Sequence, residues 1–261
     1  VAPTLTVVGA TLTAQAPRRA AWATGVAATA TAAATPGASS SARRARIVAS
    51  CDSDNPYLAS TQLLPAFDER LRVISAPALG RDTALFALRN SATGFGGDLI
   101  PLADQAAVGA AYGLAWDWRR EHLYASAYNS RASVFGPAGT GGIYRLDLTT
   151  GSVVRWGWLD AGADVHGLSN DYDRPGAFRV GETSLGDLEI DESGTFLFAV
   201  NLHDRLIYRL SLADGRVLGA FPHGAAGAPW ADDARPFGLG VRGEWVFHAV
   251  VDSRASRGGA A

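Results

Sequence analysis

The stretch LGDLEIDESGTFLFAVNLHDRLIYRLSLADGRVLGAF, from Leu185 to Phe221, decides the fold. Its apolar residues alternate with polar ones in short runs, which is the period of a β-strand. The interruptions DESG and ADG are typical turns, because Asp and Ser side chains bond to nearby backbone and Gly adopts positive φ. The stretch therefore predicts one four-stranded antiparallel sheet.

The same order of strands and turns recurs elsewhere in the chain. In residues 112–156, HLYASAY aligns with FLFAVNL, IYRLDLTTG aligns with IYRLSLADG, and Gly113 aligns with Gly186. An incomplete third copy begins at Gly238, with WVFHAVV as its second strand. Sheets of this kind cannot cover both faces alone, so repeats stack as the blades of a β-propeller. We therefore predict an all-β chain, a partial propeller with an incomplete set of blades; a β-sandwich is the alternative.

The overlay of the first two copies also sets the register of the third strands. Tyr144 and Tyr208 take equivalent positions, as do Leu146 and Leu210. We expect both leucines to be buried between blades.

Residues 1–50 are dominated by Ala, Thr, Ser and Gly. Because so few large side chains cannot offset the entropy of ordering the chain, we predict a low-complexity linker or disordered tail. Within it, APTLTVVGATLTA (residues 2–14) could add one short strand.

The incomplete propeller is predicted over residues 51–261. Two blades are expected at about 108–160 and 180–222, and a half-blade at 235–256. Before residue 108 we expect a degenerate sheet, for which LRVISAP, TALFALRN and DLIPLAD are candidate strands.

Composition narrows the function. The net charge of −2 over 261 residues argues against a nucleic-acid partner. No apolar run is long enough for a membrane span, so no membrane insertion is expected. Cys51 is alone, so no internal disulfide can form. The first residue is not methionine, which indicates a processed chain or a fragment.

Catalytic motifs are not found in the sequence. GPAGTGG (136–142) resembles a phosphate loop, but the chain has no lysine to reach the phosphates. There is no G-x-S-x-G elbow, no H-E-x-x-H and no pair of Cys or His with zinc spacing. We predict no catalytic residue and no cofactor other than a possible Ca²⁺.

Polar residues cluster where strands of a propeller reach the central channel and one rim. They could bind a small polar ligand or Ca²⁺. Alternatively, Asp–Arg pairs and Asn turns could satisfy the loops between blades; this interpretation is favoured because Arg131, Arg205 and Arg254 recur at one relative position. The ligand-binding candidates are Asp187, Asn201, His203, Asp204, Arg205, Asn129, Arg131, Asp252 and Arg254.

The long segment between the two blades, residues 159–178, is a second candidate. Asp164, Asp171 and Asp173 supply hard oxygen ligands, so we predict weak Ca²⁺ binding here. A solvated acidic loop is the alternative.

The repeats resemble bacterial propellers of the YVTN/NHL kind. The phrases AYGLAWDWRREHLYASAYNSR, FGPAGTGGIYRLDL and RPFGLGV are most similar to the propeller region of large secreted or surface proteins that carry SdrD B-like domains. The similarity covers residues 105–256. It implies an extracellular or cell-surface location and a non-enzymatic role in binding or scaffolding, with a protein or glycan ligand. It also implies that further blades and domains complete the protein.

DESGTFLFAVNLHDRLIYRLSLADG also resembles calcium-dependent lactonases of the gluconolactonase type, which is the alternative function. That family has Asn before Gly as a metal ligand at the start of the blade, and Asp on the following strand. This chain has Leu185 before Gly186, and Asn201 on the next strand, so the pattern is not fulfilled.

Overall fold

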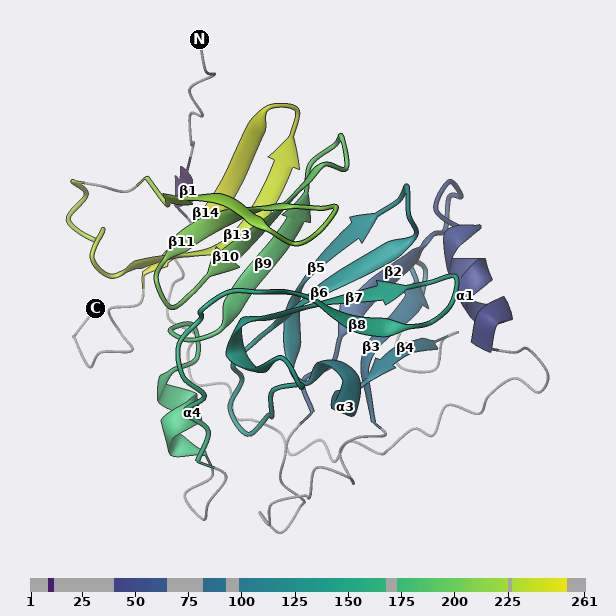
Figure 1. Cartoon of the computed structure of the whole chain (residues 1–261), viewed down its shortest axis with the longest axis horizontal. Helices are drawn as coiled ribbons and strands as arrows, with labels where there is room; N and C mark the ends of the chain where they lie inside the picture. The colour runs from purple at the N-terminus through teal and green to yellow at the C-terminus, as the bar shows by residue number, and fades with distance from the viewer. Residues whose placement is uncertain are drawn as a thin grey trace.

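The computed structural model describes residues 9–11, 40–64, 82–92, 99–167, 173–224 and 227–252. These residues form four sheets that lie side by side like the blades of an incomplete wheel (Figure 1). The all-β partial propeller predicted from the repeats is confirmed. Three short α-helices accompany the sheets in this described part: α1 (Ser40–Val48), α3 (Gln105–Val108) and α4 (Arg174–Phe178).

We name the sheets blades A to D in chain order. Blade A has three strands: β2 (Tyr57–Thr61), β3 (Thr83–Arg89) and β4 (Ile100–Asp104). Blade B has four: β5 (Ala111–Asp117), β6 (His122–Ala127), β7 (Gly142–Asp147) and β8 (Val153–Trp158). Blade C has four: β9 (Leu185–Ile190), β10 (Phe196–Asn201), β11 (Leu206–Ser211) and β12 (Val217–Pro222). Blade D pairs β13 (Ala234–Arg242) with β14 (Trp245–Asp252), and β1 (Gly9–Thr11) lies parallel to β14.

Apolar side chains fill the space between neighbouring blades. Tyr124 and Ile143 of blade B pack with Leu188, Leu197 and other aliphatic residues of blade C. Phe198 of blade C packs in the same way toward blade D. Burial of one large aliphatic or aromatic side chain contributes roughly 1.5–3 kcal/mol, so these interfaces hold the row of blades together.

The predicted register of the third strands is confirmed. Leu146 lies opposite Leu123 in blade B, and Leu210 lies opposite Leu197 in blade C. Both Leu146 and Leu210 are fully buried, with exposures of 1% and 0%. Tyr144 and Tyr208 lie opposite Ala125 and Ala199.

The overlay of Gly113 on Gly186 is wrong by one residue. The pairing places Leu114 opposite Ala125 and Leu188 opposite Ala199, so Gly113 is equivalent to Asp187. The overlay matched glycine with glycine, whereas the spacing to HLYASAY and FLFAVNL places Gly113 on Asp187. Each inner strand has a β-bulge at this position, where two residues face one residue of the second strand. The bulged pairs are Tyr112–Gly113, Gly186–Asp187 and Phe237–Gly238.

Gly113 is required because the inner strands approach closely at its bulge. A Cβ atom at Gly113 would lie 2.5 Å from the Gly186 carbonyl oxygen and 2.7 Å from Asp187 Cα. We expect Gly113→Ala to lower the free energy of unfolding by about 1–3 kcal/mol in urea titrations. Gly240→Ala is the matched control, because nothing lies within 4 Å of its Cβ position on inner strand β13. Equal stability of the two variants would contradict this packing.

The N-terminal region is more structured than predicted. Residues 40–48 form α1 rather than part of a tail. Arg44 Nε donates to the Leu148 carbonyl (3.0 Å), and Ile47 is buried. The Arg44 guanidinium and the buried Ile47 side chain thus attach this helix to the rest of the chain. Two such residues are hard to recognise in a segment rich in Ala and Ser.

The candidate strands have different outcomes. The short strand within residues 2–14 is confirmed as β1, and TALFALRN and DLIPLAD are confirmed as β3 and β4. LRVISAP lies outside the described residues.

Candidate functional site

The bulges of three inner strands converge on Asp187. Its Cα atom lies beside Gly113 of β5, and a Cβ at the preceding Gly186 would lie 3.0 Å from the Phe237 carbonyl oxygen of β13. The Leu239 amide of β13 donates to Asp187 Oδ2 (3.0 Å). Blades B, C and D therefore meet at this residue. We use the name axial site for Tyr112, Tyr128, Asp187, Glu189 and Phe237.

Asp187 is a half-buried carboxylate held by backbone. Besides the Leu239 amide, its own neighbour Leu188 donates an amide hydrogen to Oδ1 (2.9 Å). Burial raises the pKa of Asp187, although both backbone hydrogen bonds act in the opposite direction. Asp187 was predicted from the sequence as a ligand-binding candidate, and the structure places it at the junction of three blades.

Glu189 was missed by the sequence analysis. It lies two residues beyond Asp187 on β9, and burial, followed by the charge of Asp187, raises its pKa to about 7. Among the described residues, none donates a hydrogen bond to its carboxylate. The signal was available in GDLEID, because residues two apart on a strand share a face. Asp187 and Glu189 are thus two interacting carboxyl groups.

The raised pKa of Glu189 predicts a pH dependence of stability. The folded chain binds this proton more tightly than the unfolded chain between pH 4.5, the ordinary pKa, and about 7. The stability that Glu189 contributes is therefore lost as the pH rises through that window.

We expect wild type to lose stability relative to Glu189→Gln between pH 4.5 and 7 in thermal melts. His122, His223 and His248 have pKa values lowered first by burial, so they act in the opposite direction. Wild type and Glu189→Gln both contain these histidines, so the difference between their melting temperatures reports on Glu189 alone. A difference that does not change with pH would contradict the burial of Glu189.

Three aromatic rings form the wall of the axial site. The centroid of Tyr112 lies 5.1 Å from that of Tyr128 and 5.0 Å from that of Phe237. Tyr128 is buried, whereas Tyr112 is 40% exposed. Burial, together with the charge of Asp187, raises the pKa of the Tyr112 hydroxyl. The accessible ring of Tyr112 therefore belongs to the strand that lies against the backbone of Asp187.

The candidate residues that follow β10 mostly form hydrogen bonds with nearby backbone or side chains. Asn201 is fully buried; its Nδ2 donates to the Asp160 carbonyl (2.8 Å), and its Oδ1 accepts from the His203 amide (3.0 Å). Asp204 Oδ2 accepts from the Tyr208 hydroxyl (2.5 Å). Arg205 donates to the Asp232 carbonyl (2.6 Å), and His203 is exposed. The structure does not bring these side chains to Asp187 as one cluster of ligands.

The counterparts in other blades are equally dispersed. Asn129 is fully buried, and its Nδ2 donates to the Gly176 carbonyl (3.2 Å). Arg131 is exposed. Asp252 ends β14 and pairs with Ala234, and Arg254 lies outside the described residues.

The acidic segment contains a buried carboxylate. Asp173 has no exposed surface, and its oxygens accept from the amides of Ala132 (2.7 Å), Gly167 (3.0 Å) and Gly176 (3.2 Å) and contact His166 Nδ1 (2.7 Å). Burial would raise the pKa of Asp173, but these hydrogen bonds and His166 outweigh it and lower the pKa.

The other two members of the predicted calcium site differ. Asp164 is exposed, and Asp171 lies outside the described residues. Weak calcium binding at this segment therefore stays a prediction.

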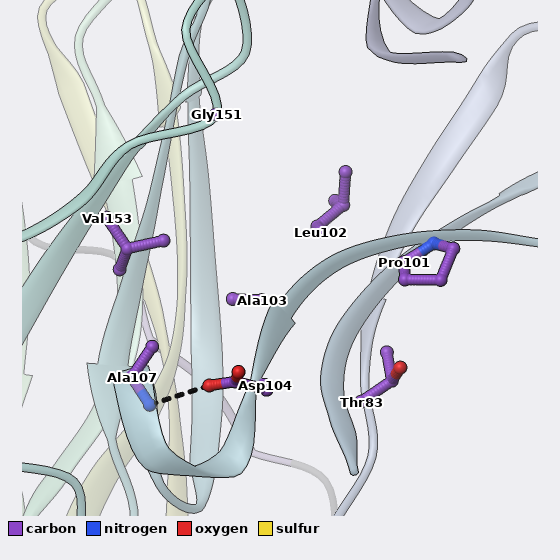
Figure 2. Close-up of a pocket in the computed structure, with 8 residues that line it drawn as sticks. All are labelled: Thr83, Pro101, Leu102, Ala103, Asp104, Ala107, Gly151 and Val153. Carbon is purple, nitrogen blue, oxygen red and sulfur yellow. Dashed lines mark hydrogen bonds between the residues drawn. The ribbon is translucent and has the colours of Figure 1, made fainter. Parts of the chain in front are cut away.

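A hollow of about 370 Å³ lies between blades A and B, away from the axial site (Figure 2). Small apolar side chains and backbone line most of it. Its one carboxylate, Asp104, accepts a hydrogen bond from the Ala107 amide (3.0 Å) and caps α3. Its polar groups thus serve the local fold, and the axial site is the better candidate.

The described part of the chain also lacks two features, a metal-ligand cluster and a membrane-spanning helix. No three His, Cys, Asp or Glu side chains there gather closely enough to hold a metal ion. No helix there has both the length and the apolar character needed to cross a membrane.

Comparison with known proteins adds limited information. No family model matches the chain. Colossin-D of Dictyostelium discoideum is 28% identical over 170 residues, which are 61% of this chain and 18% of the relative. Colossin-A of the same organism is 30% identical over 123 residues, which are 44% of this chain and 1% of the relative. The chain thus spans a small part of both relatives, and they do not show the bacterial origin that the sequence resemblance implied.

Among solved structures, a putative oxidoreductase (glucose dehydrogenase) from a Thermus species is 18% identical. The match covers 78% of this chain and 58% of that one, with a TM-score of 0.37. The SdrD B-like context remains a proposal.

Proposed function

We propose that this chain is a binding module of a secreted or cell-surface protein, and that its ligand contacts the axial site. One observation carries the proposal. Asp187 stands in the bulge of blade C, where the equivalent residues of blades B and D are Gly113 and Gly238. A half-buried carboxylate is not needed to form such a bulge, since glycine forms it twice. Asp187 thus adds a carboxylate that the bulge does not require, and this supports a role in binding.

Binding is favoured over catalysis by the groups around Asp187. The described part of the axial site contains two carboxyls, two phenols and a phenyl ring, without a nucleophile and base in hydrogen-bonding contact. Groups of this kind recognise and orient a ligand. A protein or a glycan is the kind of ligand that the sequence resemblance implies.

The lactonase alternative is favoured by one observation, the pKa of about 7 for Glu189. A carboxyl with that pKa can exchange a proton at neutral pH, as general acid–base catalysis requires. The described residues do not fit the calcium site of the lactonase pattern. Leu185 is apolar, and the Asn201 amide is bonded to Asp160 and His203. We therefore rank this function second.

A further propeller blade is the second partner that we propose. Phe247 of β14 is equivalent to Tyr124 and Phe198, both of which are buried against the next blade. Phe247 is instead 43% exposed, together with its neighbours Trp245 and Val251 on the same face of β14. This apolar face suits another blade of the same kind.

The test of the binding function uses Asp187→Gly, which restores the residue found in blades B and D. A panel of neutral sugars, amino-acid amides and δ-lactones is screened by thermal shift and by NMR. We expect at least one compound to raise the melting temperature of wild type and not that of Asp187→Gly. The variant alone should stay folded, because glycine fits the bulge, with a lower melting temperature from the lost hydrogen bonds of the Leu239 and Leu188 amides.

Three outcomes separate the candidates. Undiminished ligand binding by Asp187→Gly would contradict the axial site as the binding site. Turnover of a δ-lactone by wild type, abolished in Glu189→Gln, would favour the lactonase. Binding without turnover would support the binding module.

A further inference from the structure

We propose that the axial site binds an organic cation, an ammonium or guanidinium group, between the carboxylates of blade C and the exposed ring of Tyr112. This inference deepens the proposed function and rests on it. It follows from the charge of the site, from the rings that wall it and from the scarcity of other oxygen ligands.

The carboxyls of the axial site lack a neighbouring cation among the described residues. The pKa of Asp187 is shifted by burial and by two backbone amides, and that of Glu189 by burial and by Asp187. No described arginine is among these causes. The buried arginine of β13, Arg235, instead donates to the Leu202 carbonyl (2.6 Å). Two half-buried carboxyls without a cation carry an electrostatic cost that a bound cation would relieve.

Three aromatic rings lie together at the axial site. Tyr112 lies against Tyr128 and Phe237 and keeps 40% of its surface accessible. The electron-rich face of an aromatic ring attracts cations, with about 0.5–2 kcal/mol for each well-placed ring. Tyr112 precedes Gly113, whose Cβ position lies 2.7 Å from the Asp187 Cα atom, so the ring and the carboxylate belong to backbone segments in contact. Carboxylate and ring together match a cation that carries apolar substituents.

The axial site suits an organic cation better than a metal ion. Calcium takes six to eight oxygen ligands, whereas the axial site offers two carboxylates, one of which already accepts two amide hydrogens. No group of three metal-ligating side chains occurs among the described residues. Aromatic walls add nothing to the binding of a hard metal ion. Ammonium and guanidinium groups use both features of the site.

The experiment is isothermal titration calorimetry of the whole chain at low ionic strength. The probes are choline chloride, N-acetyl-arginine amide, calcium chloride and 3,3-dimethyl-1-butanol, which is the neutral analogue of choline. We expect choline, the arginine amide or both to bind, and to bind more tightly at pH 8 than at pH 6, where Glu189 is largely protonated. Choline alone would indicate a small-molecule ligand, and the arginine amide a side chain of a partner protein.

Variants of Asp187 and Tyr112 test the contributions of the carboxylate and of the aromatic ring separately. Asp187→Asn should weaken binding of the cation about tenfold, which corresponds to about 1.4 kcal/mol. Tyr112→Leu should weaken it about threefold or more, whereas Tyr112→Phe keeps the ring and should bind like wild type. Because Tyr112→Phe also keeps the packing, it shows whether a loss in Tyr112→Leu comes from the ring itself.

Three results would overturn the inference. They are equal binding of choline and its neutral analogue, calcium binding that the cations cannot compete with, and no binding of either cation. The binding function is judged separately. A neutral sugar that binds wild type and not Asp187→Gly would leave the proposed function standing while the cation inference fails.

Discussion

Replacing Leu210 with aspartate is expected to unfold blade C. Leu210 has no exposed surface and lies opposite Leu197, in the cluster between blades B and C. The substitution removes a large buried side chain, which costs about 2–5 kcal/mol, and adds an unpaired buried carboxyl. Since domains are stable by about 5–15 kcal/mol, most of the folded population should be lost. Circular dichroism and urea titration measure the effect.

The control for Leu210→Asp lies on the neighbouring strand. Val217 pairs with Leu210 across β11 and β12, but it is 42% exposed. Val217→Asp should change the free energy of unfolding by less than about 1 kcal/mol. Leu146→Asp in blade B should behave like Leu210→Asp. Cooperative, wild-type-like unfolding of Leu210→Asp would contradict the register of blade C, and the same result for Leu146→Asp that of blade B.

Asp173→Asn is expected to cause the second largest loss of stability, about 3 kcal/mol, because an amide nitrogen would face buried backbone amides that donate to the carboxylate. Asp173 accepts three backbone amides and contacts His166. Asparagine tolerates the left-handed backbone at this residue, where φ is 54°, so the variant tests the charge and not the conformation. Urea titration at pH 7 measures the loss.

Two comparisons make this second prediction specific. Asp164→Asn in the same segment is the control, since Asp164 is exposed and should change stability by less than about 1 kcal/mol. A double-mutant cycle with His166→Ala should show coupling of about 0.5–3 kcal/mol between His166 and Asp173. Additive effects would show that the pair does not hold the segment as described.

The sequence predicted the blades well because two signals agree there. Alternation with period two and the repeated phrase IYRL both require Leu146 and Leu210 on a buried face. Repetition removes the ambiguity that a single alternating run would leave. Helix α1 lacks such support. Its fold depends on bonds from Arg44 to residues about a hundred positions away, which no local pattern reveals.

Asp187 of the candidate site was predicted from the sequence, but its equivalence to Gly113 and the role of Glu189 were not. The overlay matched Gly113 with Gly186 because both are glycine, although the spacing to the second strands, and the bulge that both blades share, place Gly113 on Asp187. With that alignment, the overlay did not show that blade C has Asp187 where blades B and D have Gly113 and Gly238. GDLEID places Glu189 two residues from Asp187, but its burial depends on tertiary packing that this local pattern does not reveal.

The amide side chains illustrate a second limit. Asn129 and Asn201 follow equivalent strands and have the residue type of a ligand. In the structure both are buried, and their amides donate to the backbone carbonyls of Gly176 and Asp160. Sequence cannot separate an amide that caps a loop from one that binds a ligand, because both uses favour Asn at the end of a strand.

The most direct test of the convergence of three blades at Asp187 is an NMR titration of the side-chain carboxyl carbons in the folded chain. We expect Glu189 to titrate with a pKa of about 7. Asp187→Asn should lower that pKa, because it removes the neighbouring charge and leaves the burial. A Glu189 pKa near the ordinary value of 4.5, unchanged in Asp187→Asn, would contradict the axial site.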